Sequence, residues 1–279
     1  MPSAAALRLE IERKLERRFP AALSPVPRTI HEVWETGIAA ADRLLGGGLP
    51  VGAISELTGP AASGRTSLAL AFVAGRTQEE RPCAWVDVSD ALDPQSAAAN
   101  GVRLKQLLWV RCKTGERGNK GTRERENKGA RERGSMLRQR SWTQLDQGLR
   151  ATDLLLQAGG FAAIVLDLGD TAPEQANRIP AATWFRYRQA AERTQCSVVV
   201  LGKRAYAQSA AEVVLECEAV RAEVAGENAA GGTVLRGFEY TVRRGRERFA
   251  PVDIGTRKPP AATWQANAAW NAEREKVRA

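Results

Sequence analysis

Histidine, cysteine and long apolar runs are scarce in this 279-residue chain, and each scarcity excludes a class of protein. His31 is the single histidine, which argues against Ser-His-Asp or Cys-His catalysis and against histidine-rich metal sites. The four cysteines have no CxxC spacing, so we expect buried thiols rather than metal ligands or disulfides. No run approaches the roughly 20 apolar residues of a membrane span, and the N-terminus lacks the apolar segment of a signal peptide. We therefore expect a cytoplasmic protein without a membrane partner.

Positive charge is in excess, but most of the excess lies in one segment. The chain has 41 Lys+Arg against 32 Asp+Glu, a formal net charge of +9. Residues 113–140 hold ten Lys/Arg and four Glu, so this stretch carries +6 of the +9. Its composition leaves little to bury, so we predict a disordered basic insertion over 113–141. Two interpretations stay open: a solvated insertion without a role of its own, and a salt-sensitive tether for nucleic acid.

The chain divides into three predicted regions. Residues 4–19 repeat an apolar residue every four positions and end before Pro20, which predicts an amphipathic helix; a Pro-rich linker continues to residue 35. The apolar stripe of that helix docks either on its own domain or on another subunit. Residues 36–254 form the predicted core, and residues 255–279 form a C-terminal tail.

Within the core, short β-branched runs alternate with helix-like stretches. Five apolar runs read as strands buried on both faces: 53–58, 83–88, 107–112, 162–167 and 197–201. Four stretches between them read as crossover helices: 66–76, 94–101, 142–158 and 181–194. This alternation predicts an α/β fold with a mostly parallel, twisted sheet flanked by helices. Later runs at 213–217, 237–243 and 249–254 lack intervening helices, and we expect antiparallel C-terminal strands there.

The strongest motif is a glycine-bounded loop between the first predicted strand and the first predicted helix. Its residues are Gly59, Pro60, Ala61, Ala62, Ser63, Gly64, Arg65, Thr66 and Ser67. Glycines let backbone N–H groups turn inward around phosphate oxygens, and the helix that follows presents its positive end. The segment is therefore predicted to be a phosphate-binding loop (P-loop), with the Thr66 hydroxyl as a Mg²⁺ ligand.

Arg65 departs from the pattern, because a lysine is expected before the threonine. A guanidinium is planar and wider than an ammonium and cannot occupy the same small space, although it still neutralises phosphate. We therefore expect phosphate binding to survive better than phosphoryl transfer.

A second candidate metal ligand is Asp167, at the end of the apolar run 161–167. A carboxylate at the end of a buried strand, together with an upstream P-loop, is the arrangement that holds Mg²⁺ in P-loop proteins. The alternative is that Asp167 caps the following turn.

Taken together, these residues resemble the RecA superfamily of P-loop NTPases. The resemblance runs through five further segments: Thr36-Gly37, 44–52, 83–87, 90–94 and 101–108. It implies a RecA-like core that binds ATP with Mg²⁺, with single-stranded DNA and other copies of the chain as partners. By position, it also implies an adenine contact at Asp93 and a basic pair at Arg244 and Arg246 that reaches a neighbouring subunit's nucleotide.

The departures from the RecA pattern concern hydrolysis and DNA binding. Ser89 stands where RecA has its water-activating glutamate, and serine cannot act as that base at neutral pH. Asp90 is adjacent, but a shift of one residue on an extended backbone points its side chain elsewhere. The adenine-stacking aromatic aligns near Ser96, which has no ring. The segments 170–180 and 204–210 leave little room for RecA's two DNA-binding loops. We assign no catalytic residue and expect hydrolysis to be weak or lost.

A RecA-like core combined with altered hydrolysis residues resembles the ImuA family of RecA-like accessory proteins. That resemblance implies a role in the SOS response to DNA damage and in translesion synthesis, beside ImuB, a Y-family-like polymerase subunit, and beside RecA. Three hypotheses follow. An adaptor rests on Arg65, Ser89 and the short loops. A DNA-dependent recombinase ATPase rests on Thr66, Asp167 and the basic pair. A nucleotide-gated switch would bind ATP without turnover.

Overall fold

The computed structural model describes residues 32–113, 143–225, 234–247 and 260–267. The predicted N-terminal helix over 4–19, nearly all of the predicted insertion over 113–141 and the predicted strand over 249–254 lie outside these ranges. The strands are β1 (Val33–Trp34), β2 (Leu49–Pro50), β3 (Ile54–Thr58), β4 (Cys83–Asp87), β5 (Leu107–Arg111), β6 (Ala163–Asp167), β7 (Ser197–Gly202), β8 (Ala211–Cys217), β9 (Arg221–Ala225), β10 (Val234–Glu247) and β11 (Ala261–Asn267). The helices are α2 (Ala39–Leu45), α3 (Arg65–Gln78), α4 (Pro94–Ala99), α5 (Gln144–Ala158), α6 (Pro173–Ala176) and α7 (Ala181–Thr194), with short 3₁₀ turns η1 (Leu104–Gln106) and η2 (Gln208–Ala210).

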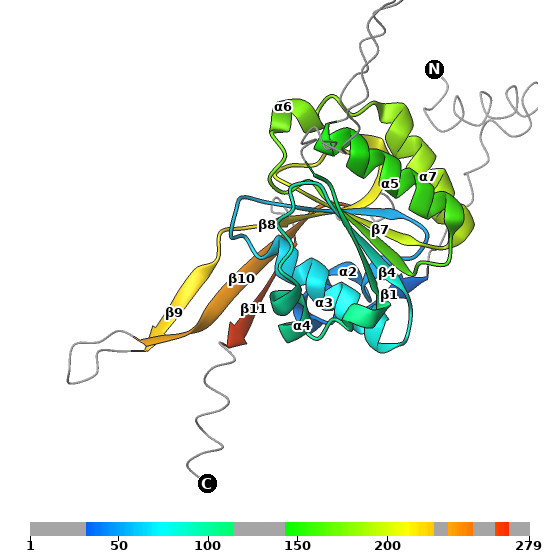
Figure 1. Cartoon of the computed structure of the whole chain (residues 1–279). Helices are drawn as coiled ribbons and strands as arrows, with labels where there is room; N and C mark the ends of the chain where they lie inside the picture. Colours follow the sequence, from blue (N-terminus) through cyan, green and yellow to red (C-terminus); the bar gives the residue numbers. More distant parts are fainter. Residues whose placement is uncertain (1–31, 114–142, 226–233, 248–259, 268–279) are drawn as a thin grey trace, which may run out of the picture. The chain divides into compact units, whose positions relative to one another are not determined.

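The main sheet confirms the predicted α/β class. Its order is β11-β10-β8-β3-β7-β6-β4-β5. In addition, β9 pairs with the N-terminal part of β10. The six strands from β8 to β5 run parallel, whereas β10 is antiparallel to its neighbours β8, β9 and β11. Figure 1 shows the antiparallel strands extending from one side of the parallel part.

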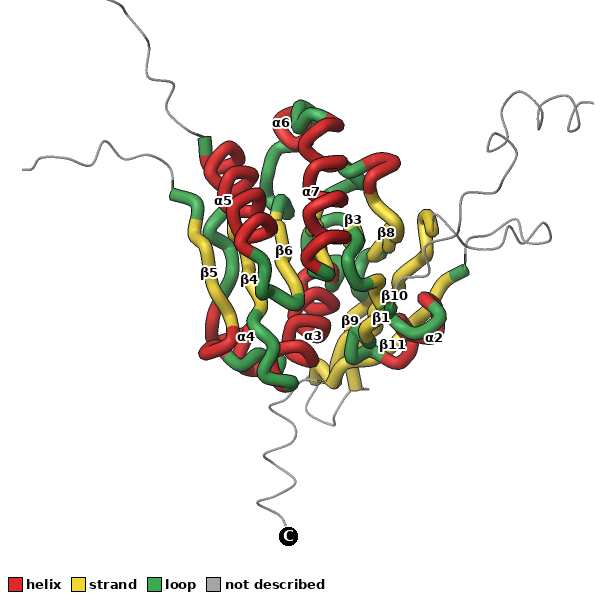
Figure 2. The backbone as a smooth tube through the Cα atoms, turned by 90° about the vertical axis from the view of Figure 1, so that its right-hand side faces the viewer, coloured by secondary structure: helices red, strands yellow, loops and turns green. Residues whose placement is uncertain are grey.

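Helices cover both faces of the sheet, as the continuous apolar strands predict. One core lies between the sheet and α2, α3 and α4, and includes the fully buried Trp85 and Phe72. The other core lies between the sheet and α5, α6 and α7, and includes Trp184 and Tyr187. Figure 2 shows α5 and α7 running along the strands on one side of the sheet, with α3 on the other.

Local signals set the starts of two helices. The Thr143 side chain accepts from the backbone N–H of Asp146, whose carboxylate accepts from the Thr143 N–H, so a reciprocal capping box begins α5. Asp93 caps α4, and Pro94 occupies the first helical position, where its missing N–H costs nothing.

Three sequence expectations about strands need correction. The run 213–217 is not an antiparallel extension, because it forms β8 parallel to β3; the chain returns through the short η2 turn instead of a helix. β5 was expected to be buried on both faces. It lies at the edge of the sheet instead, and its residues are half-buried or exposed. The range 255–279, expected to be a tail, contributes β11 to the sheet, where Trp264 packs against the first core.

All four cysteines are free and buried, as expected. Burial raises the pKa of the Cys83 and Cys217 thiols to about 12 and that of Cys112 to about 11. It raises the pKa of Cys196 as well. At neutral pH these thiols are protonated and unreactive.

Candidate functional site

The strand register brings the predicted site residues to one edge of the sheet. Thr58 at the end of β3 pairs with Gly202 of β7, and Asp167 of β6 pairs with Leu201 of β7. Asp87 at the end of β4 pairs in turn with Asp167. Because the carboxyl ends of parallel strands share an edge, the loop after β3 and the two carboxylates lie along the same rim. Open α/β sheets bind ligands at such a rim.

The segment between β3 and α3 is a tight turn bounded by glycines. Gly64 has φ +83° and directly precedes α3, so the chain turns from strand to helix through a left-handed residue. A Cβ at Gly59 would lie 2.4 Å from the carbonyl oxygen of Cys217 and 2.7 Å from the Ser63 Oγ. Strand, turn and helix therefore follow in the predicted order, and both bounding glycines are sterically required.

Arg65 is folded back into this loop. Its Nη1 donates to the carbonyl oxygens of Gly59 at 2.5 Å and of Pro60 at 2.7 Å. The residue is only 7% exposed, and its Nε is buried without a hydrogen-bond partner among the described residues. The guanidinium is thus bonded to the backbone of the loop through Nη1.

Asp167 lies beside this guanidinium. It accepts from the backbone N–H of Gly169 at 2.9 Å. A Cβ at Gly169 would lie 2.7 Å from the Arg65 Nη2 and 3.0 Å from the Asp167 Oδ1, so both side chains border the same small space. Burial raises the pKa of Asp167 from 3.8 to about 6, and nearby Asp87 adds to the rise, while the Gly169 N–H and Arg65 oppose it.

The raised pKa makes a prediction for the ligand-free protein. The folded chain keeps the Asp167 proton up to about pH 6, whereas the unfolded chain loses it near pH 3.8, so ionisation destabilises the fold progressively across that window. Asp167→Asn stays neutral and still accepts from Gly169, so its stability relative to wild type should rise as pH increases from about 3.8 to about 6 and level off above pH 6. Urea unfolding at several pH values measures the difference. Glu192→Gln, at an exposed position of α7 away from Asp167, controls for net charge. A difference that does not vary with pH would contradict the assignment.

The acidic residues at the end of β4 are both engaged in structural contacts. Asp87 is fully buried and accepts from the backbone N–H groups of Ala91 and Leu92 and from the Trp109 Nε1. Asp90 forms a two-pronged ion pair with Arg111, at 2.5 Å to Nε and 2.7 Å to Nη2. The hydrogen bond from Arg111 lowers the pKa of Asp90. The backbone at Asp90 is left-handed (φ +57°) and not extended as expected, and half-buried Ser89 lies between Asp87 and Asp90 in the chain.

Other predicted site residues make contacts of their own. Asp93 caps α4, where it accepts from the N–H groups of Gln95 and Ser96 and from the Ser96 hydroxyl, which lowers its pKa. Arg244 lies near the C-terminal end of β10 and donates from Nη1 to the Leu44 carbonyl near the end of α2. Arg246 lies two residues further along β10, where its backbone pairs with Val214. Thr66, by contrast, is exposed in the first turn of α3, beside the loop.

Sequence reasoning missed an aromatic contact on the loop. A Cβ at Gly64 would lie 2.3 Å from a Tyr240 ring carbon, so this ring packs directly on the start of α3. Tyr240 stacks on Trp264, with ring centroids 5.4 Å apart and planes 11° from parallel, and Phe238 lies beside it. The alternation of aromatics in β10 could have signalled one aromatic face, but nothing in the sequence shows that this face meets the loop.

A buried carboxylate holds the segment after β7. Glu56, in the middle of β3, accepts from the backbone N–H groups of Tyr206 at 2.6 Å and Ala207 at 2.9 Å. These residues belong to 204–210, one of the two loops that the sequence predicted to be short. The other, 170–180, contains the one-turn helix α6, and its Ala176 and Ile179 are buried in the second core.

The residues present fit polyphosphate better than they fit a divalent cation. The buried Ser63 Oγ and Arg65 Nε have no hydrogen-bond partner within the described ranges, and each is a donor that an anion would satisfy. The expected cation ligands are Thr66 and Asp167, but the Arg65 guanidinium already borders Asp167. In the part of the chain that is described, no group of three or more His, Cys, Asp or Glu side chains gathers around a common point.

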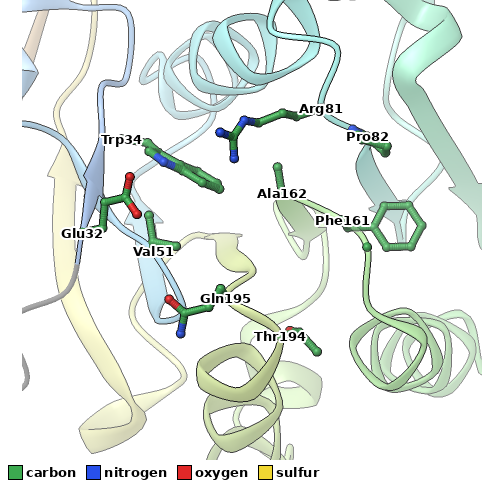
Figure 3. Close-up of a pocket in the computed structure, with 10 residues that line it drawn as sticks. Glu32, Trp34, Val51, Arg81, Pro82, Phe161, Ala162, Thr194 and Gln195 are labelled. Atoms are coloured by element: carbon green, nitrogen blue, oxygen red, sulfur yellow. The ribbon is translucent and has the colours of Figure 1, made fainter.

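A separate pocket of about 350 Å³ lies at the opposite rim, where the strands begin (Figure 3). Its lining includes Val51, Pro82, Ala162 and Gln195, which precede β3, β4, β6 and β7. Trp34 lies there beneath the guanidinium of Arg81, 5.0 Å from the ring centroid. Because parallel strands separate the two rims, this pocket is not part of the phosphate-loop site.

Comparison with known proteins identifies RecA relatives. Residues 6–124 match the RecA N-terminal domain family. Protein RecA of Crocosphaera subtropica is 39% identical over 107 residues, which is 38% of this chain and 31% of that protein. Protein RecA of Allorhizobium ampelinum is 29% identical over 187 residues, 62% of this chain and 43% of that protein. The chain thus spans less than half the length of these relatives.

Solved structures agree on the fold. The crystal structure of the RadB recombinase superposes with a TM-score of 0.52 at 16% identity, covering 83% of this chain and 94% of that one. At this identity the likeness shows a RecA/RadB-like fold alone. Among the helices that the structure describes, none is long and apolar enough to cross a membrane.

Proposed function

We propose that this RecA-like chain is an accessory protein of DNA repair that holds a nucleotide at the Gly59–Ser67 loop without turning it over. In this proposal it acts as an ImuA-type adaptor in translesion synthesis, in contact with a Y-family-like polymerase subunit. The backbone of the loop and the hydroxyl of Ser63 would hold the phosphates. A bound nucleotide would supply a rigid loop conformation.

The observation that carries the proposal is the state of the carboxylates at the end of β4. Hydrolysis needs a base that orients water, and such a group contributes about 10²–10⁴ in rate. The Asp87 carboxylate accepts hydrogen bonds from three donors, and the Asp90 carboxylate is paired with Arg111. The hydroxyl of Ser89 is not basic enough to act as this base. Nucleotide binding without turnover suits a protein that presents a surface to partners.

A turnover assay with ATP, with and without single-stranded DNA, tests the proposal on the full chain. We expect hydrolysis near background and no stimulation by DNA. DNA-stimulated turnover would overturn the adaptor role and favour a recombinase ATPase of the RecA type. Exposed Thr66 and the strand-terminal Asp167 are the observations that favour this second candidate.

Partner binding is tested separately. A purified Y-family-like polymerase subunit, titrated against the labelled full chain, should bind both with and without nucleotide if the chain is an adaptor. Binding only in the presence of nucleotide would favour the nucleotide-gated switch. RecA offered in the same format tests the other partner that the resemblance implies.

A further inference from the structure

The pocket at the rim where the strands begin lies at the ends of three helices. α3 ends at Gln78, α5 at Ala158 and α7 at Thr194, and after each helix the chain turns into a strand of the parallel sheet. Pro82, Gly160 and Thr194, which come from these helix ends and turns, line the pocket of about 350 Å³. The C-terminal end of a helix carries a partial negative charge. The three ends therefore give the pocket a negative electrostatic environment.

Oxygen acceptors lie on one side of the pocket and apolar groups on the other. Figure 3 shows Glu32 and Gln195 on one side, and Pro82 and Phe161 on the other. The Glu32 carboxylate is exposed and has no hydrogen bond or ion pair within the described residues. Gln195 donates from Nε2 to a backbone carbonyl of α7 at 2.6 Å, so its Oε1 remains as an acceptor. A positive group with an apolar stem would match both sides.

Trp34, in the wall of the pocket, already holds cations. The Arg76 guanidinium lies 5.1 Å from the centroid of its ring, and the Arg81 guanidinium lies 5.0 Å from it. Both pair with one carboxylate, that of Glu79, at 3.1 Å and 3.3 Å. The Arg81 side chain is 51% exposed, so its pairing is screened by water and it can leave the ring at small cost. The indole face, the best cation-binding surface among aromatic side chains, is therefore open to replacement of Arg81 by a ligand cation.

We propose that this pocket binds a small organic cation, a protonated amine or a guanidinium on an apolar stem. The positive group would lie between the Glu32 carboxylate and the Trp34 ring, with the stem along the apolar side. A carboxylate ligand fits less well, because Glu32 and the three helix ends would repel it and Arg81 is already paired with Glu79. The site goes beyond the proposed function, since it shares no residue with the phosphate loop.

The test uses fluorinated probes that share one apolar body and differ in charge. They are 4-(trifluoromethyl)phenethylamine, 4-(trifluoromethyl)phenethyl alcohol and 4-(trifluoromethyl)phenylacetate, titrated with the full chain at neutral pH and followed by fluorine NMR. For wild type, we expect the amine to bind at least about tenfold more tightly than the carboxylate and at least about threefold more tightly than the alcohol. Only the amine adds attraction to Glu32 and to the helix ends.

Glu32→Gln should weaken binding of the amine at least about threefold and leave binding of the alcohol unchanged. Glu35→Gln is the matched control, because Glu35 is exposed and lies outside the pocket, and it should behave as wild type. Both substitutions are at exposed positions, so the fold is kept. Equal losses of amine affinity in the two variants would show unspecific attraction by the net charge and would overturn the site.

Arg81→Gln is expected to have the opposite effect. It removes the resident cation over Trp34, so the affinity for the amine should rise at least about threefold while that for the alcohol stays the same. Arg103→Gln, at an exposed position outside the pocket, is the control for net charge. A fall in amine affinity in Arg81→Gln would contradict the inference.

Two competitors distinguish the sources of such a cation, because they carry the same four-carbon ammonium stem. Butylamine represents a free amine, and the capped peptide acetyl-Gly-Lys-Gly-amide represents a side chain of a partner protein. The one that displaces the fluorinated amine at the lower concentration identifies the source. Absence of amine binding to wild type, or equal binding of amine and carboxylate, would overturn the inference and leave the proposal for the phosphate loop intact.

Discussion

An Arg65→Lys/Ser89→Glu variant is expected to hydrolyse ATP at least about 100-fold faster than the wild-type chain, because it restores both the compact phosphate-binding cation and a base for water. Ser89 lies two residues past Asp87, whose backbone aligns with that of Asp167 across β4 and β6. A glutamate at position 89 would therefore lie at the same edge of the sheet as the phosphate loop. A coupled assay of phosphate release in Mg²⁺ measures the gain.

The matched control is Arg65→Lys/Ser89→Gln, which has the same shape without the carboxylate. It should stay at the wild-type rate. Asp90→Asn in the glutamate variant should leave the gain unchanged, since Asp90 is held by Arg111. Equal rates for the glutamate and glutamine variants would show that the missing base does not limit turnover.

Gly64→Ala is expected to lower the free energy of unfolding by roughly 2–5 kcal/mol and to abolish nucleotide binding. The new methyl group would lie 2.3 Å from the Tyr240 ring, and the residue would have to keep φ +83°. Either α3 starts differently or the ring moves away from Trp264. Urea unfolding gives the first effect, and titration with a fluorescent, non-hydrolysable ATP analogue gives the second.

A double-mutant cycle separates the two causes. On a Tyr240→Ala background the ring is gone, so Gly64→Ala should cost only the strain of its backbone conformation, about 1 kcal/mol. The difference between the two costs is the steric contribution of the ring. If Gly64→Ala costs the same on both backgrounds, Tyr240 does not restrict this glycine.

The sequence predicted the layers of the fold because strands buried on both faces form continuous apolar runs. It did not predict the direction of β8, since hydropathy has no polarity along a strand and no helix marks the crossover before it. It also missed β11, whose pairing with β10 buries Trp264 only partly. The hydropathy pattern of such a half-buried strand is weak.

For the site, motif spacing located the loop and Asp167 on one rim, and the register agrees. The fold-back of Arg65 onto Gly59 and Pro60 depends on a side-chain conformation that spacing does not encode. The contact between Tyr240 and Gly64 joins residues far apart along the chain, and it arises only when β10 joins the sheet beside β8.

The burial of all four native thiols makes this protein convenient for attaching reporters. A maleimide dye or spin label reacts with thiolate, which these protonated groups do not supply at neutral pH. A single cysteine introduced by Ala98→Cys on α4 or Val224→Cys on β9, both exposed positions, can be labelled in the otherwise native chain. Paired labels at these two places would follow the spacing between α4 and the antiparallel strands while nucleotide or a polymerase subunit is added.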